Sequence, residues 1–98
     1  MDMSPFYKSI ENHNLKELTQ LCAKNKKLDV PNDQYYYPLH FAIQKGFLDF
    51  VKLLIGNGAN INYNYKESPF SASVRFNQKE IMNFLLENGA DISLLDEI

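Results

Sequence analysis

One stretch of the chain, residues 37–62, predicts two short helices back to back and limits what the chain can fold into. The first helix is expected to begin at Pro38, because the missing N–H of proline would be unpaired in a first turn anyway. It is expected to end at Gly46, which adopts positive φ without steric strain, and the second helix is expected to end at Gly58. Helices of this length are not stable alone in water, and the apolar stripe of the second is wider than one partner helix covers. The unit therefore requires neighbours on both sides.

The neighbours are present in the sequence as two further copies of the same pattern. Pro38 corresponds to Pro69 in the copy that follows and to Pro5 in the copy that precedes. Residues 58–61, Gly-Ala-Asn-Ile, return at residues 89–92 as Gly-Ala-Asp-Ile. The apolar positions of both helices recur in the same alignment, so the chain is built from three copies of one unit.

The residues expected at positive φ also correspond between the copies. Gly46 aligns with His13 and Asn77, and Gly58 aligns with Asn25. Asparagine and histidine are among the non-glycine residues enriched in this conformation. The pattern therefore predicts positive φ at all five positions.

A repeat of about 33 residues, built as a turn and two helices, resembles the ankyrin repeat. The family motif TPLHxA, then G, then V-x-L-L, then G-A-N/D, appears here at residues 37–42, Gly46, residues 51–54 and residues 58–60. The third copy matches in its C-terminal half and departs from the motif at residues 68–73, and the first matches by pattern.

The resemblance implies an all-α solenoid of about six helices with short hairpin tips. The chain is expected to form a single domain over residues 1–98, with repeats at about residues 1–31, 32–62 and 63–98 and the outer two acting as caps. The expected helices run over about residues 4–12, 14–24, 38–46, 47–58, 69–76 and 78–88. Residues 93–98 are expected either to fray or to fold over the last helix.

The composition of the chain argues against several classes of function. A net charge of −2 over 98 residues gives no general attraction to nucleic acid or to an anionic membrane. No apolar run approaches membrane-spanning length, and the N-terminus lacks the basic and apolar segments of a signal peptide. The single cysteine, Cys22, allows no disulfide within the chain, so we predict a reducing, cytoplasmic location.

No catalytic residue, metal site or cofactor is predicted. In the pattern that the chain resembles, the histidine at His40 is structural and bonds turn backbone between repeats. His13 is expected to be a turn residue, and the spacing of the two histidines does not match a zinc site. Cys22 lies in the apolar pattern of its helix, which favours packing over a nucleophilic role.

The candidate site is a surface. In ankyrin proteins, partners usually meet the concave face, made of the hairpin tips and the exposed side of each first helix. Carried over by position, the partner-binding residues are Asp33, Gln34, Tyr35, Tyr36, Gln44, Lys45, Asn64, Tyr65, Glu67, Arg75 and Phe76, with Glu11 and Asn12 at the equivalent place in the first repeat.

Two features of this surface depart from the family pattern. Tyr35, Tyr36 and Tyr37 occupy a tip that usually has a small Gly and Thr, and Phe76 stands where a polar residue would keep the face soluble. Tyr, Phe and Arg are enriched at protein interfaces. Two interpretations stay open: the tyrosines touch a partner, or they stack on each other and on Pro38 to stiffen a small domain.

These observations predict a protein–protein interaction module that acts by occupancy, as an adaptor or a subunit. The alternative is an inhibitor or immunity protein that covers a toxin or another enzyme. The acidic C-terminal half would suit a basic partner of that kind. An enzyme based on His40, His13 and Cys22 is a remote alternative, and binding to nucleic acid, membrane or a small-molecule substrate is not expected.

Overall fold

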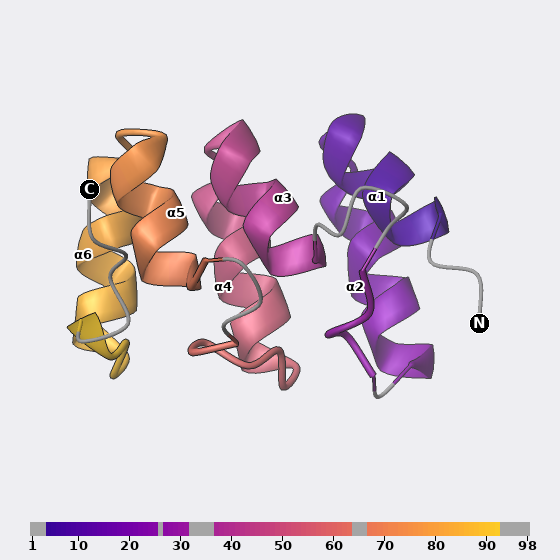
Figure 1. The fold of residues 1–98 in the computed structure, drawn as a ribbon. Coiled ribbons are helices and arrows are strands. Elements are labelled where there is room, and N and C mark those ends of the chain that lie inside the picture. Colours follow the sequence, from indigo (N-terminus) through magenta and orange to yellow (C-terminus); the bar gives the residue numbers. More distant parts are fainter. Residues whose placement is uncertain (1–3, 26, 32–36, 64–66, 93–98) are drawn as a thin grey trace.

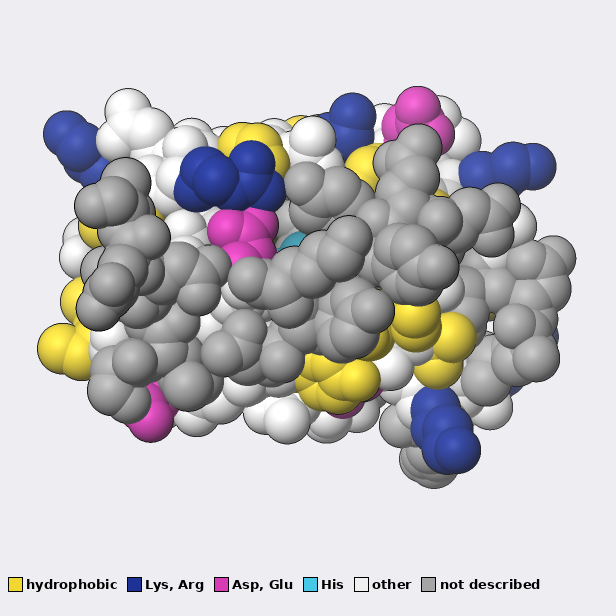
Figure 2. Space-filling view, in the orientation of Figure 1, with side chains coloured by type: hydrophobic (Ala, Val, Ile, Leu, Met, Phe, Trp, Pro, Cys, Tyr) yellow, Lys and Arg dark blue, Asp and Glu magenta, His cyan; other side chains and the backbone are white. Residues whose placement is uncertain are grey.

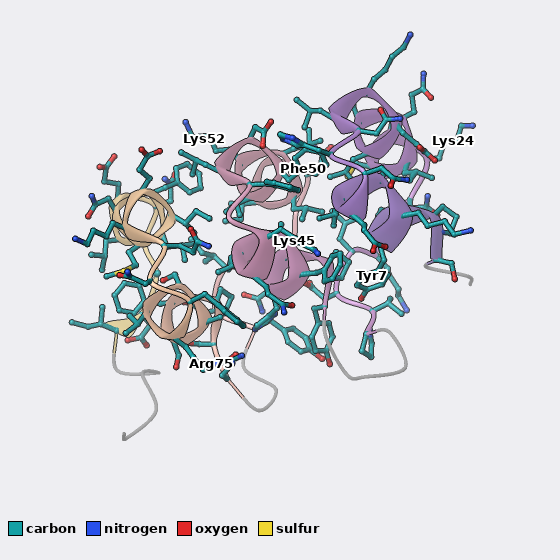
Figure 3. The ribbon with its side chains drawn as sticks, turned by 90° about the horizontal axis from the view of Figure 1, so that it is seen from above. Tyr7, Lys24, Lys45, Phe50, Lys52 and Arg75 are labelled. Carbon is teal, nitrogen blue, oxygen red and sulfur yellow. The ribbon has the colours of Figure 1, made fainter. Side chains whose placement is uncertain are left out.

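The computed structural model describes residues 4–25, 27–31, 37–63 and 67–92, which form three consecutive helix pairs in a row (Figure 1). The helices are α1 (Ser4–Glu11), α2 (Leu15–Lys24), α3 (Pro38–Lys45), α4 (Leu48–Gly56), α5 (Pro69–Arg75) and α6 (Lys79–Glu87). The first helix of each pair lies in one layer, called here the inner layer, and the second helix lies in the other, outer layer (Figure 3). The predicted all-α solenoid is confirmed.

Five of the helices are followed within two residues by a residue with positive φ. These residues are His13 (53°), Gly46 (78°), Gly58 (103°), Asn77 (55°) and Gly89 (91°). After α3, for example, the N–H of Phe47 donates to the carbonyl of Ala42 (3.1 Å) and the N–H of Gly46 donates to the carbonyl of Ile43 (3.0 Å). These two bonds satisfy carbonyls that the end of a helix leaves open, and they turn the chain from the inner to the outer layer.

The prediction of positive φ at Asn25 is wrong, because its φ is −125°. Asn25 is instead equivalent to Asn57 and Asn88, which stand one residue before the left-handed glycines. In each case the side-chain Nδ2 donates 2.8 Å to the carbonyl four residues earlier, that of Leu21 for Asn25. The first repeat lacks the glycine that follows in the other two, so its outer helix leaves in an extended conformation.

The core lies between the two layers and runs through all three repeats. It includes Phe6, Ile10 and Leu18 from the first repeat, and Ile81 and Leu85 from the third. The middle repeat contributes the largest share, because both of its sides are covered: Leu39, Ala42, Ile43, Phe50, Val51 and Leu54 are all buried.

Two serines occupy positions where the middle repeat has Ala42. The hydroxyl of Ser9 donates to the carbonyl of Phe6 (2.7 Å), and that of Ser73 donates to the carbonyl of Phe70 (2.6 Å). Each buried hydroxyl is thus satisfied within its own helix, so the polar substitution leaves the core intact.

Leu54 is expected to be the most sensitive core position in the middle repeat. Its side chain is 0% exposed, so Leu54→Ala removes buried methyl groups and leaves a cavity, which should lower the free energy of unfolding by about 2–5 kcal/mol. Chemical denaturation followed by circular dichroism measures this loss. The exposed variant Asn83→Ala is the control and should change stability by less than about 0.5 kcal/mol. Similar losses in the two variants would contradict the placement of Leu54 in the core.

Candidate functional site

His40 lies in the first turn of α3 and ties the middle repeat to the third. Its Nε2 donates to the carbonyl oxygen of Glu67 at 2.8 Å. Only a protonated nitrogen bonds a carbonyl, so the neutral ring carries its proton on Nε2. The ring is buried, and its Nδ1 has no hydrogen-bond partner among the described residues. This contact matches the structural role predicted for His40.

The surroundings of His40 hold its ring in the neutral form. Burial lowers the pKa of His40 below its ordinary value of 6.5, while the bond to the Glu67 carbonyl and the charge of Glu67 oppose this shift. The neutral state is the one that a poorly solvated imidazole favours.

Tyr7 takes the place in the first repeat that His40 has in the second. Its hydroxyl donates to the carbonyl of Val30 at 3.0 Å, so both side chains bond the backbone that leads to the next repeat. The ring of Tyr7 meets the ring of Phe41 edge-on, with centroids 5.6 Å apart. Tyr7 was not predicted from the sequence, although its alignment with His40 was a usable signal.

Arg75 and Phe76, at the end of α5, form a charged aromatic cluster with Glu67, which lies two residues before that helix begins. The guanidinium Nη2 of Arg75 donates to Oε1 of Glu67 (2.6 Å), and its Nε donates to Oε2 (3.0 Å). The same guanidinium carbon lies 4.1 Å from the ring centroid of Phe76. Two parallel bonds and a stacked ring fix this cation in place. The Arg75 side chain is nonetheless 50% exposed, so it remains accessible to a partner.

Lys45 makes a similar but looser arrangement at the end of α3. Its Nζ lies 5.3 Å from the ring centroid of Phe41, which in turn contacts Tyr7. Gln44 beside it is exposed. Figure 3 shows that Lys45 and Arg75 belong to the inner layer, whereas Lys24 and Lys52 belong to the outer layer.

The structure places the predicted inner-helix residues in equivalent pairs at the ends of the three inner helices. Glu11 with Asn12, Gln44 with Lys45, and Arg75 with Phe76 make up this row, called here the inner face. Figure 2 shows basic and acidic side chains side by side among hydrophobic ones on the side seen in Figure 1. The predicted tip residues Asp33, Gln34, Tyr35, Tyr36, Asn64 and Tyr65 lie outside the described residues.

The family model for ankyrin repeats in three copies matches residues 6–96. The chain belongs to the ankyrin repeat family. The ankyrin repeat protein OPG189 of vaccinia virus (strain Copenhagen) is 31% identical over 83 residues, which are 83% of this chain and 15% of that protein. A putative ankyrin repeat protein of Borreliella burgdorferi is 34% identical over 95 residues, 97% of this chain and 39% of that protein.

A third relative, the putative ankyrin repeat protein FPV230 of fowlpox virus, is 31% identical over 86 residues, 86% of this chain and 40% of that protein. The chain therefore spans well under half of the length of each of these three relatives. Ankyrin repeats generally mediate protein–protein interaction.

Tyr37, at the position where ankyrin repeats usually have Thr, is part of the scaffold. Its side chain is buried. Its hydroxyl donates to the hydroxyl of Tyr63 (3.1 Å), and the two ring centroids lie 4.4 Å apart. One of the three consecutive tyrosines thus packs between repeats, with its ring tilted by 49° against the tyrosine of the next tip segment. This contact agrees with the stiffening interpretation.

The remaining reactive side chains have packing or turn roles. Cys22 is buried, and burial raises the pKa of its thiol. The His13 ring stacks flat on Phe47, with centroids 4.0 Å apart, and its Nε2 lies 3.3 Å from the carboxylate of exposed Asp49. Among the described residues, no three His, Cys, Asp or Glu side chains are placed to hold a metal, and no helix is long and apolar enough to cross a membrane.

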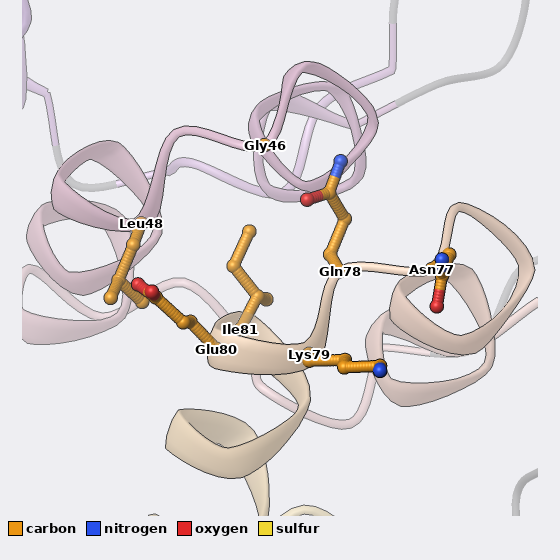
Figure 4. Close-up of a pocket in the computed structure, with 7 residues that line it drawn as sticks. All are labelled: Gly46, Leu48, Asn77, Gln78, Lys79, Glu80 and Ile81. Atoms are coloured by element: carbon orange, nitrogen blue, oxygen red, sulfur yellow. The ribbon is translucent and has the colours of Figure 1, made fainter.

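A groove of about 500 Å³ lies between the turn after α3 and the start of α6 (Figure 4). The side chain of Ile81 points into it, and Gln78 reaches toward Gly46. A Cβ on Gly46 would lie 2.8 Å from the amide nitrogen of Gln78, so the glycine leaves room for this contact between repeats. Lys79 points away from the groove. The charged and polar groups that line the groove do not converge on one point.

The buried His40 predicts that stability falls in mild acid. Because its pKa is lowered in the folded chain, the unfolded chain binds a proton more readily below about pH 6.5, so the free energy of unfolding should decrease as the pH falls through that range. Between about pH 7.5 and 5.5 the loss from one such histidine is at most about 1.4 kcal/mol. Denaturant titrations at the two pH values measure it.

Two variants separate His40 from the exposed His13. His40→Gln keeps an N–H donor for the Glu67 carbonyl and should flatten the pH dependence. His13→Asn suits the positive φ of that position and should leave the dependence on pH intact. If instead His13→Asn removed it, the assignment to His40 would be wrong.

Proposed function

We propose that this protein binds another protein through the concave inner face and acts by occupancy, as an adaptor or a subunit. The observation that carries the proposal is the cluster of Arg75, Phe76 and Glu67. Its guanidinium is held by two bonds and a ring, and the Arg75 side chain is still 50% exposed. A binding residue that is ordered before the partner arrives loses little conformational entropy on binding.

The geometry of the cluster favours a particular kind of contact. The guanidinium carbon lies 4.1 Å from the ring centroid of Phe76, and the Glu67 side chain is 15% exposed. The partner therefore meets a planar cation beside a half-buried aromatic ring, which suits backbone carbonyls, carboxylates or aromatic rings. Arg and aromatic residues are also the types that dominate binding energy at interfaces.

The tips should extend the same surface. Equivalent positions in adjacent repeats are neighbours in a solenoid, so Tyr36 on the first tip and Tyr65 on the second are expected to continue the row that Lys45 and Arg75 begin. Asp33, Gln34, Tyr35 and Asn64 complete the proposed contact set.

An inhibitor or immunity protein remains the alternative. It rests on the acidic C-terminal half, which suits a basic toxin or enzyme, yet the inner face itself is mixed, with exposed Lys45 and Arg75 beside exposed Glu11. The adaptor or subunit role is therefore preferred. We place this binding in the cytoplasm because the chain's single cysteine gives no disulfide, and we propose no catalysis and no cofactor.

Binding should depend on the cluster more than on the outer layer. After a partner has been captured from the native cell and produced separately, Arg75→Ala and Phe76→Ala should each weaken its binding by about 1–3 kcal/mol. Isothermal titration calorimetry gives the affinities, and denaturant titration of the same samples separates lost binding from lost folding.

Lys52→Ala and Asn83→Ala, on the outer layer, are the matched controls and should leave the affinity unchanged. If they weakened binding while the cluster variants did not, the inner face would not be the site. A partner that loses enzymatic activity when bound would favour the inhibitor alternative.

A further inference from the structure

Each outer helix is followed by an asparagine whose side chain bonds that helix. These residues are Asn25, Asn57 and Asn88, and Nδ2 of each donates at 2.8 Å to the carbonyl four residues earlier. Asn57 and Asn88 are exposed. They are also the only asparagines in the sequence that precede a glycine, whereas Asn25 precedes a lysine.

An Asn-Gly pair carries its own nucleophile. The backbone nitrogen of the glycine attacks Cγ of the asparagine side chain, a C–N bond forms, and ammonia leaves with the proton of the attacking nitrogen. The product is a cyclic succinimide. Water then opens the ring at either carbonyl, which gives aspartate or isoaspartate and adds a negative charge. Glycine favours this reaction because it has no Cβ to hinder the attacking nitrogen or to restrict the backbone.

The fold restrains both reacting groups at the end of α4. The amide of Asn57 is bonded to the carbonyl of Leu53, and the N–H of Gly58 donates to the carbonyl of Ile55 at 3.1 Å. The same two bonds recur at the end of α6, where the backbone bond measures 3.3 Å. Both bonds must break before the nitrogen can attack, so the reaction requires the last turn of the outer helix to open. Helix ends open locally at low cost in free energy.

Both asparagines stand three residues before a bond between repeats. The N–H of Asn60 donates to the carboxylate of Asp29 at 3.2 Å, and the N–H of Asp91 donates to Oδ1 of Asn62 at 2.9 Å. Conversion of the preceding asparagine removes its amide donor and sets a carboxylate against the negative end of the helix. In isoaspartate it also lengthens the backbone by a methylene group. The modification would therefore loosen the contact between neighbouring repeats.

We propose that Asn57 and Asn88 are sites of spontaneous deamidation, held closed by the fold and reactive when the end of α4 or α6 opens. The reaction needs only water and turns a transient opening into a permanent change in the outer layer. Asn25 makes the same side-chain bond without a glycine after it, so it is the unreactive counterpart within the same chain. The proposal does not depend on binding at the inner face.

Incubation of the full chain in mildly alkaline buffer, followed by peptide mapping with mass spectrometry, tests the proposal. Asn57 and Asn88 should convert to aspartate and isoaspartate, while Asn25 stays an amide over the same period. In urea that unfolds the chain, both Asn-Gly sites should react roughly tenfold faster or more, because the fold limits the reaction to the fraction of molecules that are open.

Two glycine variants separate the chemistry from the opening. A Cβ at Gly56 or Gly58 would meet no atom within 4 Å. Gly58→Ala hinders the attacking nitrogen and should reduce conversion of Asn57 well below that of Asn88 in the same sample, although the φ of 103° at Gly58 makes this variant less stable. Gly56→Ala keeps the Asn-Gly pair and favours the helical last turn, so it should slow Asn57 about two- to fivefold and leave Asn88 unchanged.

A product mimic tests the structural consequence. Asn57→Asp should lower the urea midpoint of unfolding by about 0.5 M, because it removes the donor to Leu53 and adds a charge at the helix end. Asn83→Asp adds the same charge to an exposed position within α6 and should have a smaller effect.

Three results would overturn the proposal. Asn25 could convert as fast as Asn57, so that the glycine would not determine the site. The folded chain could react as fast as the unfolded chain, which would mean that the fold does not hold the sites closed. Both sites could also stay unmodified in the folded chain while they react in urea, which would mean that the ends of α4 and α6 do not open.

Discussion

Burial between neighbouring repeats is the interaction on which this fold depends. The helices have seven to ten residues, and helices of that length do not hold their backbone bonds in water by themselves. What keeps them folded is the apolar layer that each repeat shares with the next, centred on Phe50, Val51 and Leu54 of the middle repeat. The stability of each helix therefore depends on its neighbours, and the middle repeat, with two of them, is the best supported part of the chain.

The same dependence explains how the inner face becomes rigid. Tyr7 and His40 bond the backbone that precedes the next repeat, and Tyr37 reaches Tyr63. The bond from His40 holds the backbone of Glu67, whose carboxylate pairs with Arg75. Contacts that hold the stack together thus also fix the orientation of groups exposed on its surface.

Much of the fold was predictable because it depends on local backbone rules repeated three times. The helix ends at His13 and Asn77 followed from alignment with Gly46, since each position requires positive φ. Asn25 was mispredicted because the sequence shift aligned it with a glycine, whereas its side-chain bond shows it to be equivalent to Asn57.

The site was less predictable than the fold. Alignment located the row of Lys45, Arg75 and Phe76, because their place in the repeat fixes their side of the helix. The pairing of Arg75 with Glu67 and the contact of Tyr7 with Phe41 depend on distances between repeats, which no sequence pattern contains.

Three of the polar bonds between repeats share a direction that bears on how such chains change over evolutionary time. Asp29 accepts the N–H of Asn60 (3.2 Å), Asn62 accepts the N–H of Asp91 (2.9 Å), and His40 donates to the carbonyl of Glu67. In each case a side chain of one repeat bonds the main chain of the next. The receiving residue can mutate to almost any other type and still offer the same atom. Substitutions in the segments that receive these bonds therefore leave the stacking of the repeats intact. The binding surface can change in sequence while the fold stays the same.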